Sequence, residues 1–204
     1  EMQFGFVERP THRSRGYDQQ RFEVCNHHYT ALCDNAHGCA VLNDCKYGVG
    51  VEENSIELTL LRAAASPQMQ SDQGKQHFSY GFTAWEGTFA DAPVVRQGLA
   101  FNESIARESG SLKTFSAFSA DHENIIVDTL KPADDGSGDL ILRLYESKKA
   151  DTVFHLLTDL PVAELIPCSM LEENNAAGLA PDAQIHARPF EIKTFRVRLR
   201  HDKK

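Results

Sequence analysis

Apolar and polar residues alternate with a period of two in several stretches of the chain, namely 56–60, 78–82 and 195–200. Because successive side chains of a strand point to opposite faces, each stretch is predicted to be a strand with one buried face. The stretch Leu140–Tyr145 is apolar except for Arg143, which is typical of a more central strand. In the last stretch, the predicted buried face consists of Phe195, Val197 and Leu199. The opposite face consists of Arg196, Arg198 and Arg200.

Turn-forming residues separate these stretches, and no long helical periodicity is present. The only helix-like stretch, Leu60–Ala65, stops at Ser66-Pro67 and is too short to predict a helix. Many short strands between turns predict an all-β fold of the sandwich type. The predicted turns are Gly48-Val49-Gly50, Asp72-Gln73-Gly74, Glu86-Gly87 and Asp134–Gly138.

A polar segment, Glu103–Thr114, separates two strand-rich halves and is the best candidate for a domain boundary. We therefore predict domains at 1–108 and 109–204. The second half has enough strands for a small sandwich of its own. The first half has few apolar residues before Phe22, as expected for part of a larger domain. An unpaired sheet edge or apolar patch near Phe4–Val24, with self-association as a homo-oligomer, is therefore expected.

The net charge of −8 disfavours a nucleic-acid partner, because phosphate binding requires clustered lysines and arginines. It also disfavours docking on anionic membranes. Strictly apolar runs such as Cys39–Leu42 are much shorter than the roughly 20 residues of a membrane span, so no membrane segment is expected.

One stretch of the chain is rich in potential zinc ligands. It lacks a Cys-x-x-Cys pair, and its alternation predicts strands that would direct these side chains to both faces. A structural zinc site and buried free cysteines are both compatible with this stretch, and we expect it to hold no metal. The odd total of five cysteines also fits a reducing compartment better than a disulfide framework. The potential ligands are Cys25, His27, His28, Cys33, His37, Cys39 and Cys45.

Neither a nucleophile elbow nor a metalloprotease helix motif nor a phosphate-binding loop occurs in the sequence. Two polar segments stand out from the alternation, Arg9–His12 and Asn43–Gly48. The second follows an apolar strand and is predicted to turn at Gly48. Such segments are usually solvated loops, although loops on a rigid sandwich also carry binding residues.

These two segments belong to a longer series of matches, which resembles the C-terminal region of glycoside hydrolase family 38 α-mannosidases, most closely the cytosolic and bacterial branch. The matches occur in order and extend over about residues 4 to 199. The chain departs from the family at Ser14–Gln19, where aromatic residues are largely lost, and at Ala84–Gly87. The matching motifs are Phe4-Gly5, Arg9–His12, Arg21–Val24, Leu42–Gly48, Leu58–Arg62, Asp72–Gly74, His77-Phe78, Leu142–Glu146 and Pro189–Ile192.

The resemblance implies the later part of a large β-sandwich of the mutarotase-like supersandwich type, followed by a small terminal β-sandwich. In this family, zinc and the aspartate nucleophile of retaining α-mannoside hydrolysis belong to an N-terminal barrel domain introduced by a His-x-Asp pattern. None of the nine histidines here begins that pattern, so the chain alone is expected to be inactive and to hold no cofactor. Its expected partner is the catalytic domain of the same polypeptide, which is expected to be cytoplasmic. Through that domain, the polypeptide is expected to bind mannosides.

Six residues of the two polar segments are therefore candidates for an inter-domain seam or for the rim of the substrate cleft, since Arg and Lys suit sugar hydroxyls or carboxylates. Two other hypotheses remain open. The first is a free-standing carbohydrate-binding β-sandwich, which would need aromatic platforms, although Trp85 is the only tryptophan. The second is a zinc-stabilised interaction domain, which would depend on the Cys/His stretch. The six candidates are Arg9, His12, Asn43, Asp44, Lys46 and Tyr47.

Overall fold

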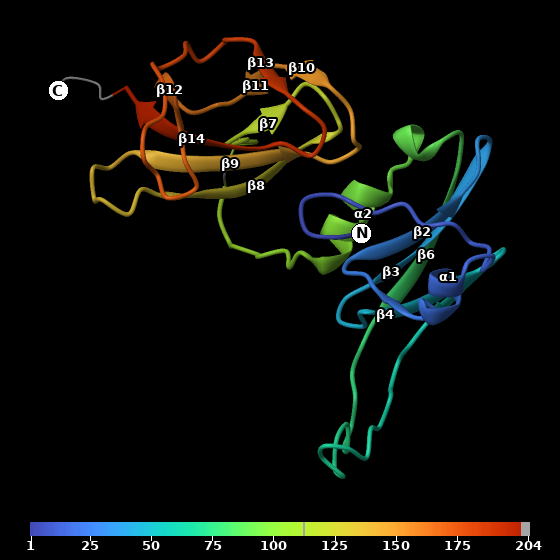
Figure 1. Ribbon diagram of the computed structural model, residues 1–204. Helices are drawn as coiled ribbons and strands as arrows, with labels where there is room; N and C mark the ends of the chain where they lie inside the picture. The colour runs from blue at the N-terminus through green and yellow to red at the C-terminus, as the bar shows by residue number, and fades with distance from the viewer. Residues whose placement is uncertain (112, 201–204) are drawn as a thin grey trace. The chain divides into compact units, whose positions relative to one another are not determined.

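The computed structural model describes residues 1–111 and 113–200 (Figure 1). The chain forms two compact units, of which the first comprises Glu1–Arg107 and the second begins at Glu108. The division falls within the polar segment 103–114, whose described residues belong to no helix or strand. Short antiparallel strands make up most of both units, and the prediction of an all-β, sandwich-like fold is confirmed.

The first unit contains two three-stranded antiparallel sheets. One has the strand order β2-β3-β6, and the other has the order β1-β4-β5. The alternating stretches 56–60 and 78–82 correspond to β5 and to the start of β6. The bounds are β1 Val24–Cys25, β2 Tyr29–Cys33, β3 His37–Asn43, β4 Gly48–Glu52, β5 Ser55–Leu58 and β6 Tyr80–Glu86.

The stretch Gly48-Val49-Gly50, predicted as a turn, is instead the beginning of strand β4. Val49 pairs with Val24 of β1 and with Leu58 of β5, and it is almost completely buried. The two glycines are required by close packing rather than by a turn. A Cβ atom on Gly48 would lie 2.5 Å from the Glu23 side chain, and one on Gly50 would lie 3.0 Å from the Phe22 carbonyl oxygen.

Helix α2 (Val94–Asn102) covers one face of the β2-β3-β6 sheet, and the sequence pattern did not predict it. Val94, Val95 and Gly98 are its buried residues. A Cβ atom on Gly98 would lie 3.2 Å from the Tyr29 ring of β2, so a glycine here lets the helix approach the sheet. Two β-branched residues and a glycine in nine positions give a low helix propensity, so packing determines this helix.

Two further helical turns occur in the first unit: α1 (Gly16–Gln20) and the 3-10 turn η1 (Phe89–Asp91). Large apolar side chains remain exposed in this unit. Phe82 on the edge strand β6 is 72% exposed, and Phe22 in the predicted patch near Phe4–Val24 is 58% exposed. Self-association through these side chains stays a prediction.

The second unit is built on a four-stranded antiparallel sheet with the order β12-β14-β9-β8. Strand β9 contains the stretch Leu140–Tyr145 and lies inside this sheet, so its predicted central position is confirmed. Two short strand pairs, β10–β13 and β11–β7, complete the unit. The bounds are β7 Ser119–Ala120, β8 Ile125–Pro132, β9 Leu140–Glu146, β10 Thr152–Phe154, β11 Leu156–Leu157, β12 Val162–Cys168, β13 Ile185–Ala187 and β14 Ile192–Leu199.

Apolar side chains from both the main sheet and the short pairs enclose one core in the second unit. Within it, Leu142, Leu144 and Phe154 have no exposed surface. The cluster joins residues of strands that are distant in sequence, which is the arrangement of a packed sandwich interior. Its most buried members also include Ile125, Leu165, Ala187 and Val197.

The prediction that β14 has only one buried face is wrong at Arg196, which is buried although it belongs to the arginine face of the pattern. Its side chain is 9% exposed and forms ion pairs with Asp135 at 2.8 Å and Asp139 at 3.4 Å. Asp135 belongs to the predicted turn Asp134–Gly138, and Asp139 follows it in the same connection between β8 and β9. Arg198 behaves as predicted: its exposed side chain pairs with Glu164 at 3.0 Å.

Candidate functional site

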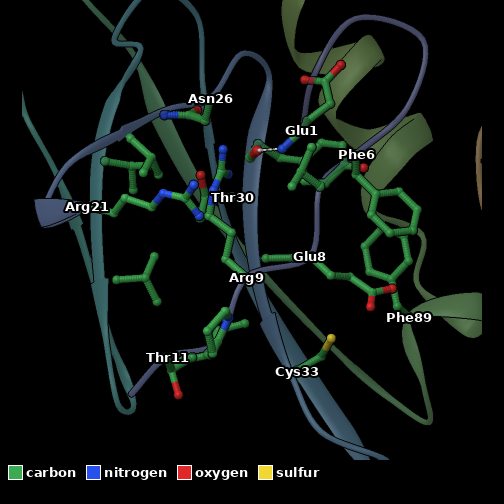
Figure 2. A pocket seen from close by; sticks show the side chains of 18 of the residues that line it. Glu1, Phe6, Glu8, Arg9, Thr11, Arg21, Asn26, Thr30, Cys33 and Phe89 are labelled. Carbon is green, nitrogen blue, oxygen red and sulfur yellow. Dashed lines mark hydrogen bonds between the residues drawn. The ribbon is translucent and has the colours of Figure 1, made fainter. Parts of the chain in front are cut away.

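A cavity of about 450 Å³ lies in the first unit, and we call it the sheet cavity (Figure 2). Its apolar wall comes from strands of both sheets and includes Val24 of β1, Tyr29 of β2, and Val49 and Val51 of β4. The segment 6–13 lines the cavity as well and contributes Arg9 and His12. Two of the six predicted candidates therefore line the sheet cavity.

Backbone and side-chain contacts hold the segment 6–13 against the sheet β1-β4-β5. The backbone N–H of Glu53, in the turn between β4 and β5, donates to the carbonyl oxygen of Thr11 at 3.0 Å. Arg13 forms an ion pair with Glu52 at 3.2 Å. Arg9 belongs to this tethered segment, and its side chain points into the cavity in Figure 2.

Arg21 enters the cavity from another segment, because it is the residue that ends helix α1. Asp18 fixes this short helix: its buried carboxylate accepts from the backbone N–H and the Nε of Arg15, both at 3.1 Å. These bonds hold the pKa of Asp18 below its usual value, against the opposing effect of desolvation. The helix thereby sets the direction of Arg21, although Arg21 was not among the predicted candidates.

Most carboxylates that line the sheet cavity have partners of their own. Glu1 accepts from the backbone N–H of His28 at 2.6 Å and pairs with its ring, which lowers the pKa of Glu1 although burial opposes the shift. Asp34 accepts from the backbone N–H groups of Ala36 and His37 at 2.7 and 2.8 Å. Neither Glu1 nor Asp34 forms an ion pair with Arg9 or Arg21.

Two buried polar atoms of residues that line the cavity have no hydrogen-bond partner among the described residues. They are Oγ1 of Thr30 and Nδ2 of Asn26, and Asn26 is only 2% exposed. Buried polar atoms are nearly always paired, so such atoms beside a cavity indicate a place for a ligand or for water.

His12 lines the sheet cavity with an exposed side chain, and its Nδ1 lies 2.9 Å from the hydroxyl of Ser14. This contact orients the imidazole within its loop. Neither Arg9 nor His12 has an ion-pair partner in residues 1–111 and 113–200.

The other four candidates lie in the turn 43–47 between β3 and β4 and do not line the cavity. Asn43 is buried and connects three segments of the first unit. Its Nδ2 donates to the Asn26 side chain at 2.8 Å and to the His27 carbonyl at 2.6 Å, and its Oδ1 accepts from the Lys46 backbone at 2.7 Å. Asn43 thus positions Asn26 at the cavity.

Asp44, Lys46 and Tyr47 are more accessible than Asn43. Asp44 accepts from the backbone N–H of Ser79 at 2.9 Å, and this bond is the main reason why its pKa is lowered. The ammonium of Lys46 lies 5.0 Å from the centre of the Phe78 ring. Tyr47 is 53% exposed. The turn itself begins after Asn43 and ends at Gly48, which opens β4, rather than turning at Gly48 as predicted.

The Cys/His stretch does not converge on one point. Within residues 1–111 and 113–200, no group of three or more His, Cys, Asp or Glu side chains could hold a metal ion. All five cysteines are free; Cys25, Cys33 and Cys45 are exposed and Cys39 is half-buried, so the alternative of buried cysteines in this stretch is wrong. The residues present do not fit a zinc site, and we assign this stretch no metal chemistry.

Trp85 is not available as a flat platform for sugar binding. Its ring packs on the backbone of Gly38, its cross-strand partner in β3, and its Nε1 donates to the Thr88 carbonyl at 3.1 Å. Among the described residues, moreover, no helix is both long enough and apolar enough to cross a membrane.

Comparison with protein families gives two matches along the chain. Residues 1–70 match the family described as glycosyl hydrolases family 38 C-terminal domain. Residues 124–195 match the glycosyl hydrolases family 38 C-terminal beta sandwich domain. The chain belongs to the C-terminal region of glycosyl hydrolase family 38. The predicted resemblance is thus confirmed, and the two family 38 matches lie in the first and the second unit, respectively.

Curated relatives of this family 38 chain are α-mannosidases. Alpha-mannosidase G of Dictyostelium discoideum is 38% identical over 96% of this chain and 19% of that protein. Human alpha-mannosidase 2C1 is 36% identical over 87% of this chain and 18% of that protein. The Saccharomyces cerevisiae alpha-mannosidase is 27% identical over 97% of the chain and 21% of that protein. The chain spans about a fifth of the length of these relatives.

Solved structures show the same fold at lower sequence identity. The crystal structure of an alpha-mannosidase from Enterococcus faecalis V583 has a TM-score of 0.74 at 20% identity and covers 95% of this chain and 23% of that chain. A second Enterococcus faecalis structure, of a protein in glycosyl hydrolase family 38, has a TM-score of 0.68 at 19% identity and covers 95% of this chain and 24% of that chain.

Proposed function

We propose that the chain forms the non-catalytic C-terminal β-domains of an α-mannosidase and supports a catalytic domain of the same polypeptide. The observation that carries this proposal is the similarity to three α-mannosidases over 87–97% of the chain. Because this region is only about a fifth of those relatives, most of their length remains for a catalytic domain. The composition agrees, since a net charge of −8 disfavours nucleic acid and anionic membranes as partners.

In this proposal, the retaining hydrolysis of α-mannosides and the zinc ion belong to the catalytic domain. The described residues support this division of labour, since their His, Cys, Asp and Glu side chains form no ligand group. The polypeptide would work in the cytoplasm, where free cysteines such as the exposed Cys25 and Cys33 stay reduced.

The two groups of candidate residues would have different roles. Arg9 and His12 lie at the sheet cavity and would contact another part of the polypeptide. Asp44, Lys46 and Tyr47 lie on an accessible turn and would approach the rim of the substrate cleft, while the buried Asn43 holds that turn in place. A carbohydrate-binding module is the weaker alternative, because Trp85 is packed against the sheet.

Hydrolysis of an aryl α-mannoside tests the main proposal. We expect no turnover by the 204-residue chain with or without added zinc, and turnover by a longer polypeptide that contains it. Deleting this region from the longer polypeptide should abolish turnover and lower its melting temperature. Turnover by the chain alone that disappears on changing one of its residues would contradict the proposal.

Substitutions in the turn test the proposed rim. In the longer polypeptide, Asp44→Ala or Lys46→Ala should lower kcat/KM at least tenfold with little change in melting temperature, because a charge directed at a buried partner is costly to remove. Lys75→Ala is the matched control, since Lys75 lies on an exposed loop. Unchanged kcat/KM in both turn variants would assign the turn to ordinary solvated loops.

A further inference from the structure

We infer that Arg9 and Arg21 form a binding site for a carboxylate group inside the sheet cavity, and that the carboxylate is carried by an acidic protein segment. The site lies in the first unit and uses residues that the hydrolysis of mannosides does not require. It goes beyond the proposed supporting role because it names the chemistry of the group that the cavity accepts.

The first observation is the convergence of two positive charges. Figure 2 shows the side chains of Arg9 and Arg21 entering the cavity from different segments and meeting beside Thr30. An anion placed between two guanidinium groups that are directed at the same space is attracted by both of them. In residues 1–111 and 113–200, neither has a carboxylate partner, and the contact of Arg21 is with the Tyr17 ring at 5.2 Å.

The second observation is that carboxylates in the cavity wall are directed elsewhere. Asp18 is bonded to Arg15, and Glu1 is bonded to His28. Figure 2 shows the Glu8 carboxylate turned towards Phe89 and away from both guanidinium groups. These directions leave space for an anion beside the two guanidinium groups.

The third observation is the set of other donors at the same place. The Thr30 hydroxyl oxygen and the Asn26 Nδ2 are buried and have no partner among the described residues. Asn26 is held from the other side, since its Oδ1 accepts from Asn43 at 2.8 Å. Guanidinium, hydroxyl and amide donors together match the two oxygens of a carboxylate, each of which accepts more than one hydrogen bond.

The walls of the cavity favour a protein segment over a small acid. Val24, Val49 and Val51 line it with β-branched side chains from two adjacent strands, and Phe22 nearby in sequence is 58% exposed. A peptide supplies apolar side chains on either side of an Asp or Glu, whereas a small acid leaves these walls in contact with water. A neutral sugar would leave both guanidinium groups without a counter-charge.

Titration of the isotope-labelled 204-residue chain with two pentapeptides, followed by NMR, tests the site. The probes are acetyl-Val-Thr-Asp-Val-Thr-amide and the same peptide with Asn for Asp. We expect the Asp peptide to shift the amide signals of Arg9 and Thr30 and to bind at least tenfold more tightly than the Asn peptide. Arg9→Gln and Arg21→Gln should each weaken the Asp peptide at least tenfold.

The matched control is Arg198→Gln, which removes an exposed arginine of the second unit and should leave the affinity unchanged. Thermal melts verify folding, and since Arg9 and Arg21 are exposed, their variants should melt like the parent. The site would be overturned if the chain bound the Asp and Asn peptides with equal affinity. It would also be overturned if the Arg9→Gln and Arg21→Gln variants bound the Asp peptide as tightly as the parent chain does. If glutarate bound as tightly as the Asp peptide, the inference that a protein segment carries the carboxylate would be overturned. Methyl α-mannoside shifting the same signals without a response to the Asp peptide would identify a sugar site instead.

Discussion

The second unit has one enclosed apolar core, whereas the first unit keeps an open cavity lined by strands of both its sheets. Among the described residues, six buried side-chain polar atoms lack a partner, and five of them lie in the first unit. Large aromatic side chains such as Phe82 and Phe22 are also exposed there. Satisfied, enclosed groups stabilise a fold, and unsatisfied groups beside a cavity indicate a surface that binds something else.

The largest expected contrast comes from one phenylalanine in each unit. Phe154→Ala should lower the free energy of unfolding of the second unit by about 3–5 kcal/mol, because a fully buried ring leaves a cavity. Phe82→Ala, which removes a 72% exposed ring from the first unit, should change it by less than about 0.5 kcal/mol. Denaturant unfolding with amide exchange as the probe measures both. Similar losses for the two variants would remove the contrast between the units.

The next effect concerns the packing that the first unit does have. Gly38→Ala should destabilise that unit by about 1–3 kcal/mol, because the added Cβ would overlap the Trp85 ring. Gly16→Ala is the control, since no atom lies within 4 Å of its added Cβ. Trp85 is the only tryptophan, so its fluorescence reports on the first unit alone. An unshifted emission maximum and an unchanged midpoint in Gly38→Ala would show that the ring moves away without cost.

Two arginines of strand β14 compare a buried and an exposed ion pair in the second unit. Arg196→Met should lower the free energy of unfolding by about 1–2 kcal/mol. The reason is that Asp139, which is 15% exposed, loses its partner, whereas Asp135 can rehydrate. Arg198→Met should cost less than about 0.5 kcal/mol, since its pair with Glu164 is exposed. Urea unfolding of both variants decides the point, and equal midpoints would argue that the buried cluster adds no stability.

The smallest effects are pH-dependent, and the carboxyl groups compared in the second unit respond in the opposite direction to a histidine of the first unit. In the second unit, contacts with His122 and His155 hold the pKa of Asp121 far below its usual value, and Ser137 lowers the pKa of Asp135 to about 2. A lowered carboxyl pKa stabilises the fold above about pH 4, and this contribution is lost as the pH falls towards the folded value. The protection factors of the β9 amides, which are corrected for the intrinsic exchange rate, should therefore fall below about pH 4, and Asp121→Asn should weaken the trend.

In the first unit, the hydrogen bond to Glu1 raises the pKa of His28. A raised histidine pKa stabilises the fold below about pH 6.5, and this contribution is lost as the pH rises through the folded value. The melting temperature reported by Trp85 should fall slightly from about pH 6 to pH 8. His28→Asn should flatten this slope, and a slope that persists in the variant would assign the effect to another group.

The amino-acid sequence by itself determined the strands and the family of this protein. Alternation at 56–60, 78–82 and 195–200 identified β5, β6 and β14, and the apolar run 140–145 identified the central strand β9. These predictions hold because the two-residue period of a strand is a local property of the chain. The ordered polar and apolar motifs identified family 38, since many matches in sequence are more specific than any one of them.

Tertiary structure alone decided the features that depend on distant neighbours. Gly48 and Gly50 lie in a strand because the backbone near Phe22 and Glu23 comes close, and α2 forms because Val94 and Val95 are buried. Arg196 is buried because the β8–β9 turn brings carboxylates to it. The sheet cavity joins Arg9 to Arg21, Asn26 and Thr30, which lie 12 to 21 positions further along the chain. No sequence period encodes such contacts, because they arise only when separate segments pack together.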